Sequence, residues 1–161
     1  MIYTNIANLK RDLQPESRFL GLDVGTKVIG LAFSDPSRTI CNPIASIDSF
    51  GNKKDFPKIK EYIDQNEVEL LVIGLPIHLD GSESDISNFV RRFANNLDLF
   101  LSGKIKIILQ DERYSSSSAR IFIDDNLSLK KKHSRKKTID KIAANIILES
   151  FLLEINTSSQ L

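Results

Sequence analysis

The spacing of hydrophobic and polar residues predicts three short strands in the first third of the chain. Apolar stretches at 19–23, 28–34 and 39–47 are separated by turns that are too short to hold a helix. Strands joined by such turns pair in an antiparallel manner, so the three stretches predict a meander. Because Pro43 cannot donate a hydrogen bond to a neighbouring strand, we expect the third strand at a sheet edge or at a bulge.

The rest of the chain alternates between helical and strand patterns. Continuous apolar runs at 68–74 and 105–109 are typical of central strands that are buried on both faces. Apolar residues at helical spacing predict four helices, at about 56–63, 86–97, 116–124 and 138–155, the last with Thr138 as its N-cap. This order predicts an α/β fold whose five-stranded mixed sheet, an antiparallel three-strand meander plus two parallel strands, is flanked by helices.

Length and composition are those of one ordinary folded domain. Of the 161 residues, 41% are hydrophobic and 27% charged, and we place the domain at 18–155, between an N-terminal extension (1–17) and a C-terminal tail (156–161). The single cysteine, Cys41, excludes a disulfide framework and suits a reducing compartment. No apolar run approaches the ~18 residues needed to cross a bilayer, so we expect a cytoplasmic protein with no membrane partner.

The formal net charge of +1 hides a strong asymmetry in where the charges lie. Residues 130–137 read KKKHSRKK and hold six basic side chains, those of Lys130, Lys131, Lys132, Arg135, Lys136 and Lys137. Without these six, the chain has 16 basic and 21 acidic residues, a net charge of −5. Such a run is most often a solvated charged loop, but it also suits binding to a phosphate backbone.

Acidic residues fall where ligands gather in sheets of the predicted kind. Asp23 ends the first predicted strand, and Asp111 and Glu112 follow the fifth. Asp140 lies in the first turn of the last predicted helix. In sheets built from strand–helix–strand units, ligands bind outside the carboxyl ends of the parallel strands. We therefore expect these acids to share one rim of the sheet.

Carboxylates without histidine or cysteine partners are the ligands that Mg²⁺ and Mn²⁺ prefer. Two such ions can hold the attacking and leaving oxygens of a phosphodiester. Each acid also has a plainer interpretation: turn chemistry for Asp23, a solvated loop with a local ion pair for residues 111–113, and the helix dipole for Asp140. Their joint placement beside a basic segment favours a nuclease that uses Mg²⁺ or Mn²⁺, as two ions, and binds nucleic acid.

Four sequence blocks resemble, in the same order, those of the YqgF family, which is also called RuvX. The blocks are LGLDVGTKVIGLAFSD (20–35), VIGLPIHLDGSES (72–84), DERYSSSSAR (111–120) and IDKIAANIILESFL (139–152). The resemblance implies a ribonuclease H-like fold and a metal-dependent endonuclease that matures the 5′ end of precursor 16S rRNA. Structured DNA, such as a Holliday junction, is the other substrate that it implies.

The resemblance also implies roles for individual residues. It makes Asp23, Glu112 and Asp140 the catalytic residues and the metal ligands. On charge and position, we add Lys27, Arg113 and the basic segment 130–137 as contacts to phosphates.

Other function classes stay open at this point. The sequence DVGT at 23–26 also resembles the first phosphate motif of actin-like ATPases, although 161 residues leave room for only one of the two domains that such a cleft needs. A non-catalytic RNA-binding assembly factor would use the basic segment while the acids serve the structure. In each case we expect a monomer or a weak dimer.

Overall fold

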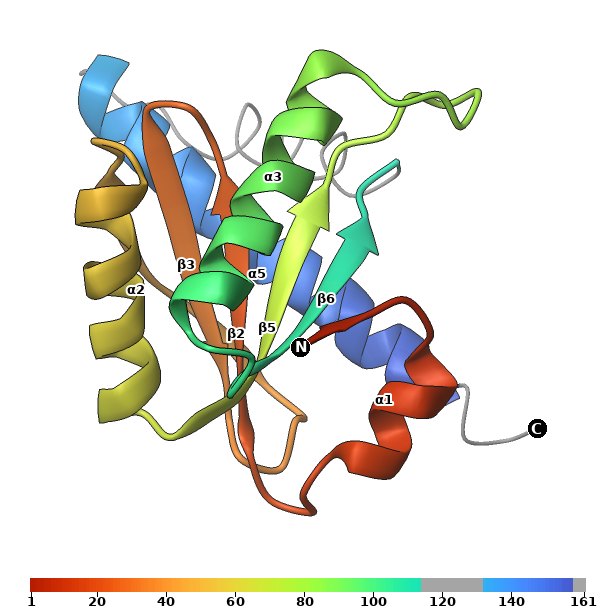
Figure 1. The fold of residues 1–161 in the computed structure, drawn as a ribbon. Coiled ribbons are helices and arrows are strands. Elements are labelled where there is room, and N and C mark those ends of the chain that lie inside the picture. Colours follow the sequence, from red (N-terminus) through yellow and green to blue (C-terminus); the bar gives the residue numbers. More distant parts are fainter. Residues whose placement is uncertain (114–131, 158–161) are drawn as a thin grey trace.

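The computed structural model describes residues 1–113 and 132–157, and its strands form one six-stranded sheet with helices on both faces (Figure 1). The spatial order of the strands is β1-β6-β5-β2-β3-β4. Their bounds are Ile2–Tyr3 for β1, Arg18–Val24 for β2, Val28–Ser34 for β3, Cys41–Asp48 for β4, Val68–Leu75 for β5 and Lys106–Asp111 for β6. Among the described residues, no helix is long and apolar enough to cross a membrane.

The pairing of the strands confirms the predicted mixed sheet. β2, β3 and β4 pair antiparallel as a meander, whereas β2, β5 and β6 pair parallel. β4 lies at the sheet edge, and its register against β3 shifts between Leu31, which faces Ala45, and Ala32, which faces Pro43. Both features expected of Pro43, an edge position and an irregularity, are therefore present.

The first residues of the chain add a sixth strand that the hydrophobic pattern did not predict. β1 pairs parallel with β6, with Ile2 facing Ile107, and helix α1 (Ile6–Asp12) follows after the N-cap Asn5. Leu9 of α1 is fully buried in the apolar core. A two-residue strand is too short to show an alternating pattern, so the five-stranded prediction lacked this edge.

Two apolar layers cover the sheet, one on each face. Helices α2 (Asn52–Gln65) and α3 (Asp85–Phe100) pack on one face, where the rings of Phe56 and Phe93 meet edge-to-face at 5.2 Å. Helix α5 (Lys132–Thr157) crosses the other face (Figure 1). The predicted helix at 116–124 lies outside the described residues.

The last helix starts earlier than the sequence pattern predicted. α5 begins at Lys132, so Thr138 lies inside the helix and is not its N-cap, and Asp140 is beyond the first turn. Residues 132–137 contain no glycine or proline, and lysine and arginine are good helix formers, so the helix includes this part of the basic segment. The helix dipole therefore does not explain Asp140.

Two glycines let helix α5 approach the sheet until backbone meets backbone. A Cβ atom on Gly21 of β2 would lie 2.8 Å from the carbonyl oxygen of Ala144. A Cβ atom on Gly30 of β3 would collide with the carbonyl group of Asp140. Only glycine leaves room for the helix at these two positions, so they set how closely α5 lies against β2 and β3.

Replacing Gly30 with alanine is expected to destabilise the protein. The added methyl group would meet the backbone of Asp140 and Lys141, which cannot turn aside as a side chain can. Overpacking of this kind costs about 1–3 kcal/mol, and we expect the free energy of unfolding in urea to fall by that amount. The control Asn42→Ala, at an exposed position of β4, should change it by less than about 0.5 kcal/mol. Unchanged stability of Gly30→Ala would contradict the contact.

Candidate active site

Asp23 lies near the end of β2, on the sheet face that α5 covers. It faces Gly30 in the neighbouring strand β3 and is only partly exposed. Burial, together with the negative charge of Asp140, raises the pKa of Asp23 from 3.8 to about 7. A carboxyl group whose ionisation is opposed in this way is suited to a site that holds a positive charge.

The contact between α5 and the sheet places Asp140 near Asp23. Its backbone packs on Gly30, the residue that pairs with Asp23, and the side chain is half-buried with Oδ2 hidden from solvent. The negative charge of Asp140 also helps to raise the pKa of Asp23, as expected for two acids on the same face of the sheet. The structure therefore brings together two of the three acids that the sequence singled out.

Glu112 comes to the same face from β6. It follows the last residue of that strand, and its N–H donates to the carbonyl oxygen of Leu75 at 3.1 Å. Its carboxylate lies over Gly74 of β5, where a Cβ atom would be 2.7 Å from the Glu112 Cδ atom. Because Leu22 of β2 faces Ile73 of β5, Gly74 lies in line with Asp23. Glu112 thus points along the sheet toward the two aspartates.

Asp111 and Arg113 form a local ion pair instead of joining the acids. The Arg113 Nε–H donates to Asp111 Oδ2 at 2.7 Å, and the Arg113 backbone N–H donates to Asp111 Oδ1 at 2.9 Å. The plainer interpretation of Asp111 therefore holds. Arg113, predicted to contact phosphates, is engaged by this neighbour through part of its guanidinium group.

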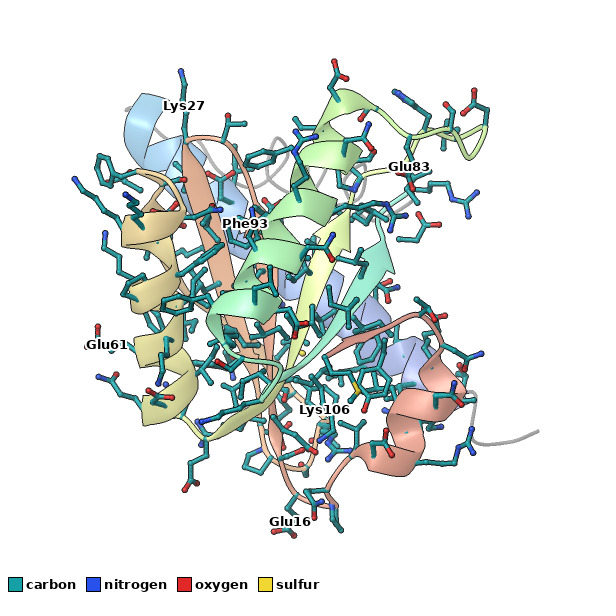
Figure 2. All side chains as sticks on the ribbon, in the orientation of Figure 1. Glu16, Lys27, Glu61, Glu83, Phe93 and Lys106 are labelled. Atoms are coloured by element: carbon teal, nitrogen blue, oxygen red, sulfur yellow. The ribbon has the colours of Figure 1, made fainter. Side chains whose placement is uncertain are left out.

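The predicted basic residues lie at the same end of the sheet wherever they are described. Lys27 is exposed at the tip of the turn between β2 and β3 and points away from the sheet (Figure 2). The first turns of α5, which contain 132–137, lie at this end as well (Figure 1). Lys130 and Lys131 lie outside the described residues, as do the side chains of 132–137.

The loop after β5 is an ordered hairpin at this rim. Ile77 and Glu83 form a β-bridge, and the backbone N–H of His78 donates to the carbonyl oxygen of Ser82 at 3.0 Å. Gly81 makes the turn with a φ of +85°, in the region that favours glycine. His78 is exposed in this loop. The loop is therefore a tight structural turn held by its own backbone hydrogen bonds.

The acids suit a divalent cation by their chemistry and their mutual repulsion. Three carboxylates offer only oxygen donors, as Mg²⁺ and Mn²⁺ prefer, and a cation would relieve the conflict that raises the pKa of Asp23. Within 1–113 and 132–157, no three acidic, histidine or cysteine side chains are gathered tightly enough to form a complete ligand set. Gly30 and Gly74 supply the room that the acids use. Sequence reasoning gave no signal for Gly30, because its role depends on contact with a helix that is distant in the sequence.

Solved structures of two Holliday junction resolvases share this fold. RuvC of T. thermophilus, in complex with a Holliday junction substrate, matches with a TM-score of 0.51 at 9% identity, over 88% of this chain and 97% of RuvC. The fowlpox virus resolvase, in complex with Holliday junction DNA, matches with a TM-score of 0.51 at 14% identity, over 85% and 97%. The fold is thus the ribonuclease H-like fold of resolvases, as predicted.

Sequence comparison gives the family. The model of the RuvX family, described as Holliday junction resolvase, matches residues 17–154. A relative from Thermoanaerobacter pseudethanolicus is 39% identical over 135 residues, which are 84% of this chain and 95% of the relative. One from Rickettsia bellii is 34% identical over 156 residues, which are 97% and 99%. Both carry the name "Putative pre-16S rRNA nuclease". The chain belongs to the RuvX family and is a nuclease, in agreement with the sequence analysis.

The raised pKa of Asp23 predicts how stability depends on pH when no metal is present. Between about pH 4 and pH 7, the folded protein keeps a proton that the unfolded chain releases, so the free energy of unfolding falls as the pH rises. Asp23→Asn removes this cost. In EDTA at about pH 8, the free energy of unfolding of Asp23→Asn should exceed that of the native protein by about 2 kcal/mol, since Asp23 is only partly exposed. Near pH 4 the two proteins should be equally stable. Urea unfolding at both pH values checks this, and an equal difference at both would contradict it.

Proposed function

We propose that this nuclease is a metal-dependent endonuclease that trims the 5′ end of precursor 16S rRNA in the cytoplasm. The observation that carries the proposal is the pairing of Asp23 with Asp140 beside Gly30, where burial and like charge oppose ionisation. A bound cation would offset the repulsion between the two carboxylates, so a site of this kind favours cation binding. The choice of RNA is supported by the names of relatives that match this chain over nearly their whole length.

Asp23, Glu112 and Asp140 are the residues that would hold the metal, as Mg²⁺ or Mn²⁺ and as two ions. When bound, such ions stabilise the charge that develops on a phosphodiester during in-line displacement and make water a better nucleophile. The chain itself supplies the fixed strand end that carries Asp23 and the helix backbone that carries Asp140. Strand pairing fixes the backbone of Asp23, and the contact with Gly30 fixes the backbone of Asp140, so both residues stand at this rim before substrate arrives.

Basic side chains at the same end would bind the substrate backbone. Lys27 extends from the turn that follows Asp23, and residues 132–137 of the basic segment form the first turns of the helix that carries Asp140. Both cationic regions are therefore close in sequence to an acid of the site. Neutralising phosphates on either side would keep the scissile bond over the carboxylates, and binding would weaken as salt rises.

Branched DNA is the second candidate substrate, because the family is described as Holliday junction resolvase. The same metal chemistry and the same cationic rim would serve either nucleic acid. Cleavage of a precursor 16S 5′-leader RNA beside a four-way DNA junction, with Mg²⁺, Mn²⁺ or EDTA, separates the two. We expect cleavage of the RNA only, and only with metal.

Removing one carboxylate of the site is expected to abolish cleavage without abolishing binding. Asp23→Asn, Glu112→Gln and Asp140→Asn should each lower the cleavage rate on the order of 100-fold or more, because metal ligands are lost. Their affinity for the RNA should stay within a few-fold of the native value. Gel-based cleavage and filter binding on the same preparations measure both.

Asp111→Asn is the matched control, since it removes the carboxylate next to Glu112 that is paired with Arg113. It should keep cleavage within a few-fold of the native rate. Full activity of Asp23→Asn would leave the acids with a structural role and favour a non-catalytic RNA-binding factor.

Metal addition should stabilise the native protein and not the variant. At about pH 8, saturating Mg²⁺ or Mn²⁺ should raise the melting temperature of the native protein by several degrees, since binding to the folded state alone shifts the equilibrium. Asp23→Asn, which lacks the buried charge, should show a clearly smaller rise. Thermal unfolding followed by circular dichroism gives both values, and equal shifts would contradict the assignment of Asp23 as a ligand.

A further inference from the structure

An exposed aromatic ring with lysines over it stands at the active-site end of the sheet. Phe50, in the loop between β4 and α2, is 65% exposed, the largest fraction for any phenylalanine among the described residues. We infer that Phe50 and the lysines around it form a stacking site for an unpaired nucleotide of the substrate strand. This inference rests on the proposed function and names the part of the substrate that the site would receive.

The loop that carries Phe50 is fixed, so the exposure of the ring is built in. The carboxylate of Asp55, which is 1% exposed, accepts hydrogen bonds from the Ser49 hydroxyl at 2.6 Å and from the backbone N–H groups of Phe50 at 2.9 Å and Gly51 at 3.2 Å. Gly51 has a φ of +94°, which permits the sharp turn into α2. The backbone at Phe50 is thus locked by a buried acid while the ring projects into solvent.

Two lysines from the first turns of α2 lie over the Phe50 ring. The Nζ atoms of Lys54 and Lys58 lie 5.4 and 5.5 Å from the centre of the Phe50 ring, within the range of cation–π attraction. Lys53 is exposed in the same turn. Both ammonium groups lie over the ring, so a stacking base would take the place of one of them, and the displaced lysine would be free to pair with the adjoining phosphate.

A hollow of about 390 Å³ lies against the ring, and Phe50, Lys58 and Tyr62 contribute to its lining. Asp48 and Glu61 line it as well. Carboxylate oxygens repel phosphates but accept hydrogen bonds from the N–H groups of bases. The base, with its phosphates turned toward the lysines, is therefore the part of a nucleotide that suits this hollow.

The loop is joined to the strand turn that follows Asp23. The backbone N–H of Ser49 donates to the carbonyl oxygen of Lys27 at 2.9 Å, and Asp48 faces Val28 across β3 and β4. α2 and α5 both begin at this end of the sheet (Figure 1), and Lys27 projects from it (Figure 2). A strand lying over the acids could therefore continue past Lys27 onto the Phe50 ring.

Stacking requires a base whose face is free, which a duplex does not offer. The site therefore fits a single-stranded stretch next to the cleaved bond, and its affinity should combine stacking with a salt-dependent contribution from the lysines. A large exposed apolar side chain can also mark a protein-binding surface. The lysines beside Phe50 favour a nucleic acid over a protein partner, and binding measurements with Phe50 variants distinguish these two partners.

Fluorescence anisotropy with a fluorescein-labelled single-stranded RNA and a duplex of equal length tests the inference. All variants are made in the Asp23→Asn background, so that the probe stays intact. Phe50→Ala should weaken binding of the single strand about tenfold and leave binding of the duplex unchanged. Phe50→Tyr should restore the affinity, whereas Phe50→Leu, which is apolar but has no aromatic face, should not. Leu99→Ala, at a position that is 77% exposed on α3, is the control and should bind as the parent does.

The lysines are tested by the salt dependence of the same binding. Lys54→Gln and Lys58→Gln should each reduce the slope of log Kd against log salt by about 0.7 for the single strand. Lys60→Gln is the matched control, because Lys60 is exposed on the same helix and paired with Asp64. It should leave the slope unchanged.

The possible outcomes separate this inference from the proposed function. Unchanged binding by Phe50→Ala, equal losses for single strand and duplex, or full affinity of Phe50→Leu would each overturn the stacking site, whatever the nuclease assay gives. If the native protein cleaves nothing with either metal while Phe50→Ala still loses the single strand selectively, the stacking site stands and the nuclease assignment falls. Absence of binding to the single strand by the parent protein would also overturn the inference.

Discussion

The contact of helix α5 with two glycines of the sheet is the constraint on which the candidate site depends. At Gly30, the helix backbone at Asp140 rests directly on β3, and Asp23 is the residue that faces Gly30 on β2. One close approach therefore sets the distance between two acids that are far apart in the sequence. The same contact buries Asp23 and holds a like charge beside it, which together raise its pKa to about 7. The geometry and the electrostatics of this site therefore both depend on the two glycines that let α5 lie close to the sheet.

The strands and the acids could be predicted because their signals are local. The bounds of β3 match the predicted 28–34, and Pro43 marked the edge strand through the hydrogen bond that it cannot make. The carboxyl ends of parallel strands bring Asp23 and Glu112 to one rim by topology alone. What could not be predicted depends on contacts at long range: β1 is held by its pairing to β6, and the pairing of Arg113 with Asp111, and not with Glu112, depends on side-chain geometry that the topology does not set, although the family resemblance had already singled out Glu112. The start of α5 at Lys132 was missed because charged residues carry no apolar period, although they form helices readily.

The near-neutral net charge of +1 is the sum of regions with opposite tasks. Acids are grouped on the face under α5, whereas cations lie on the turns and helix starts at the end of the sheet, as Lys27 and the lysines near Phe50 show. Buried carboxylates attract cations because water does not screen them, and exposed lysines attract a polyanion because they can reach it. The acids are partly buried and the lysines are exposed, although they are close in the sequence. One small domain can therefore attract both a metal cation and a polyanion.

The bulged register at Pro43 has a consequence for how this protein can meet others. One edge of the sheet ends in β4, where a proline and a shifted register interrupt the row of hydrogen-bonding groups. The opposite edge ends in β1, which has only two residues before the chain turns into α1. Among the described strands, neither edge offers a continuous ladder to a further strand, so addition of a strand from a second chain is disfavoured at both edges. In this part of the chain, the sheet edges therefore work against the edge-to-edge pairing that leads to aggregation.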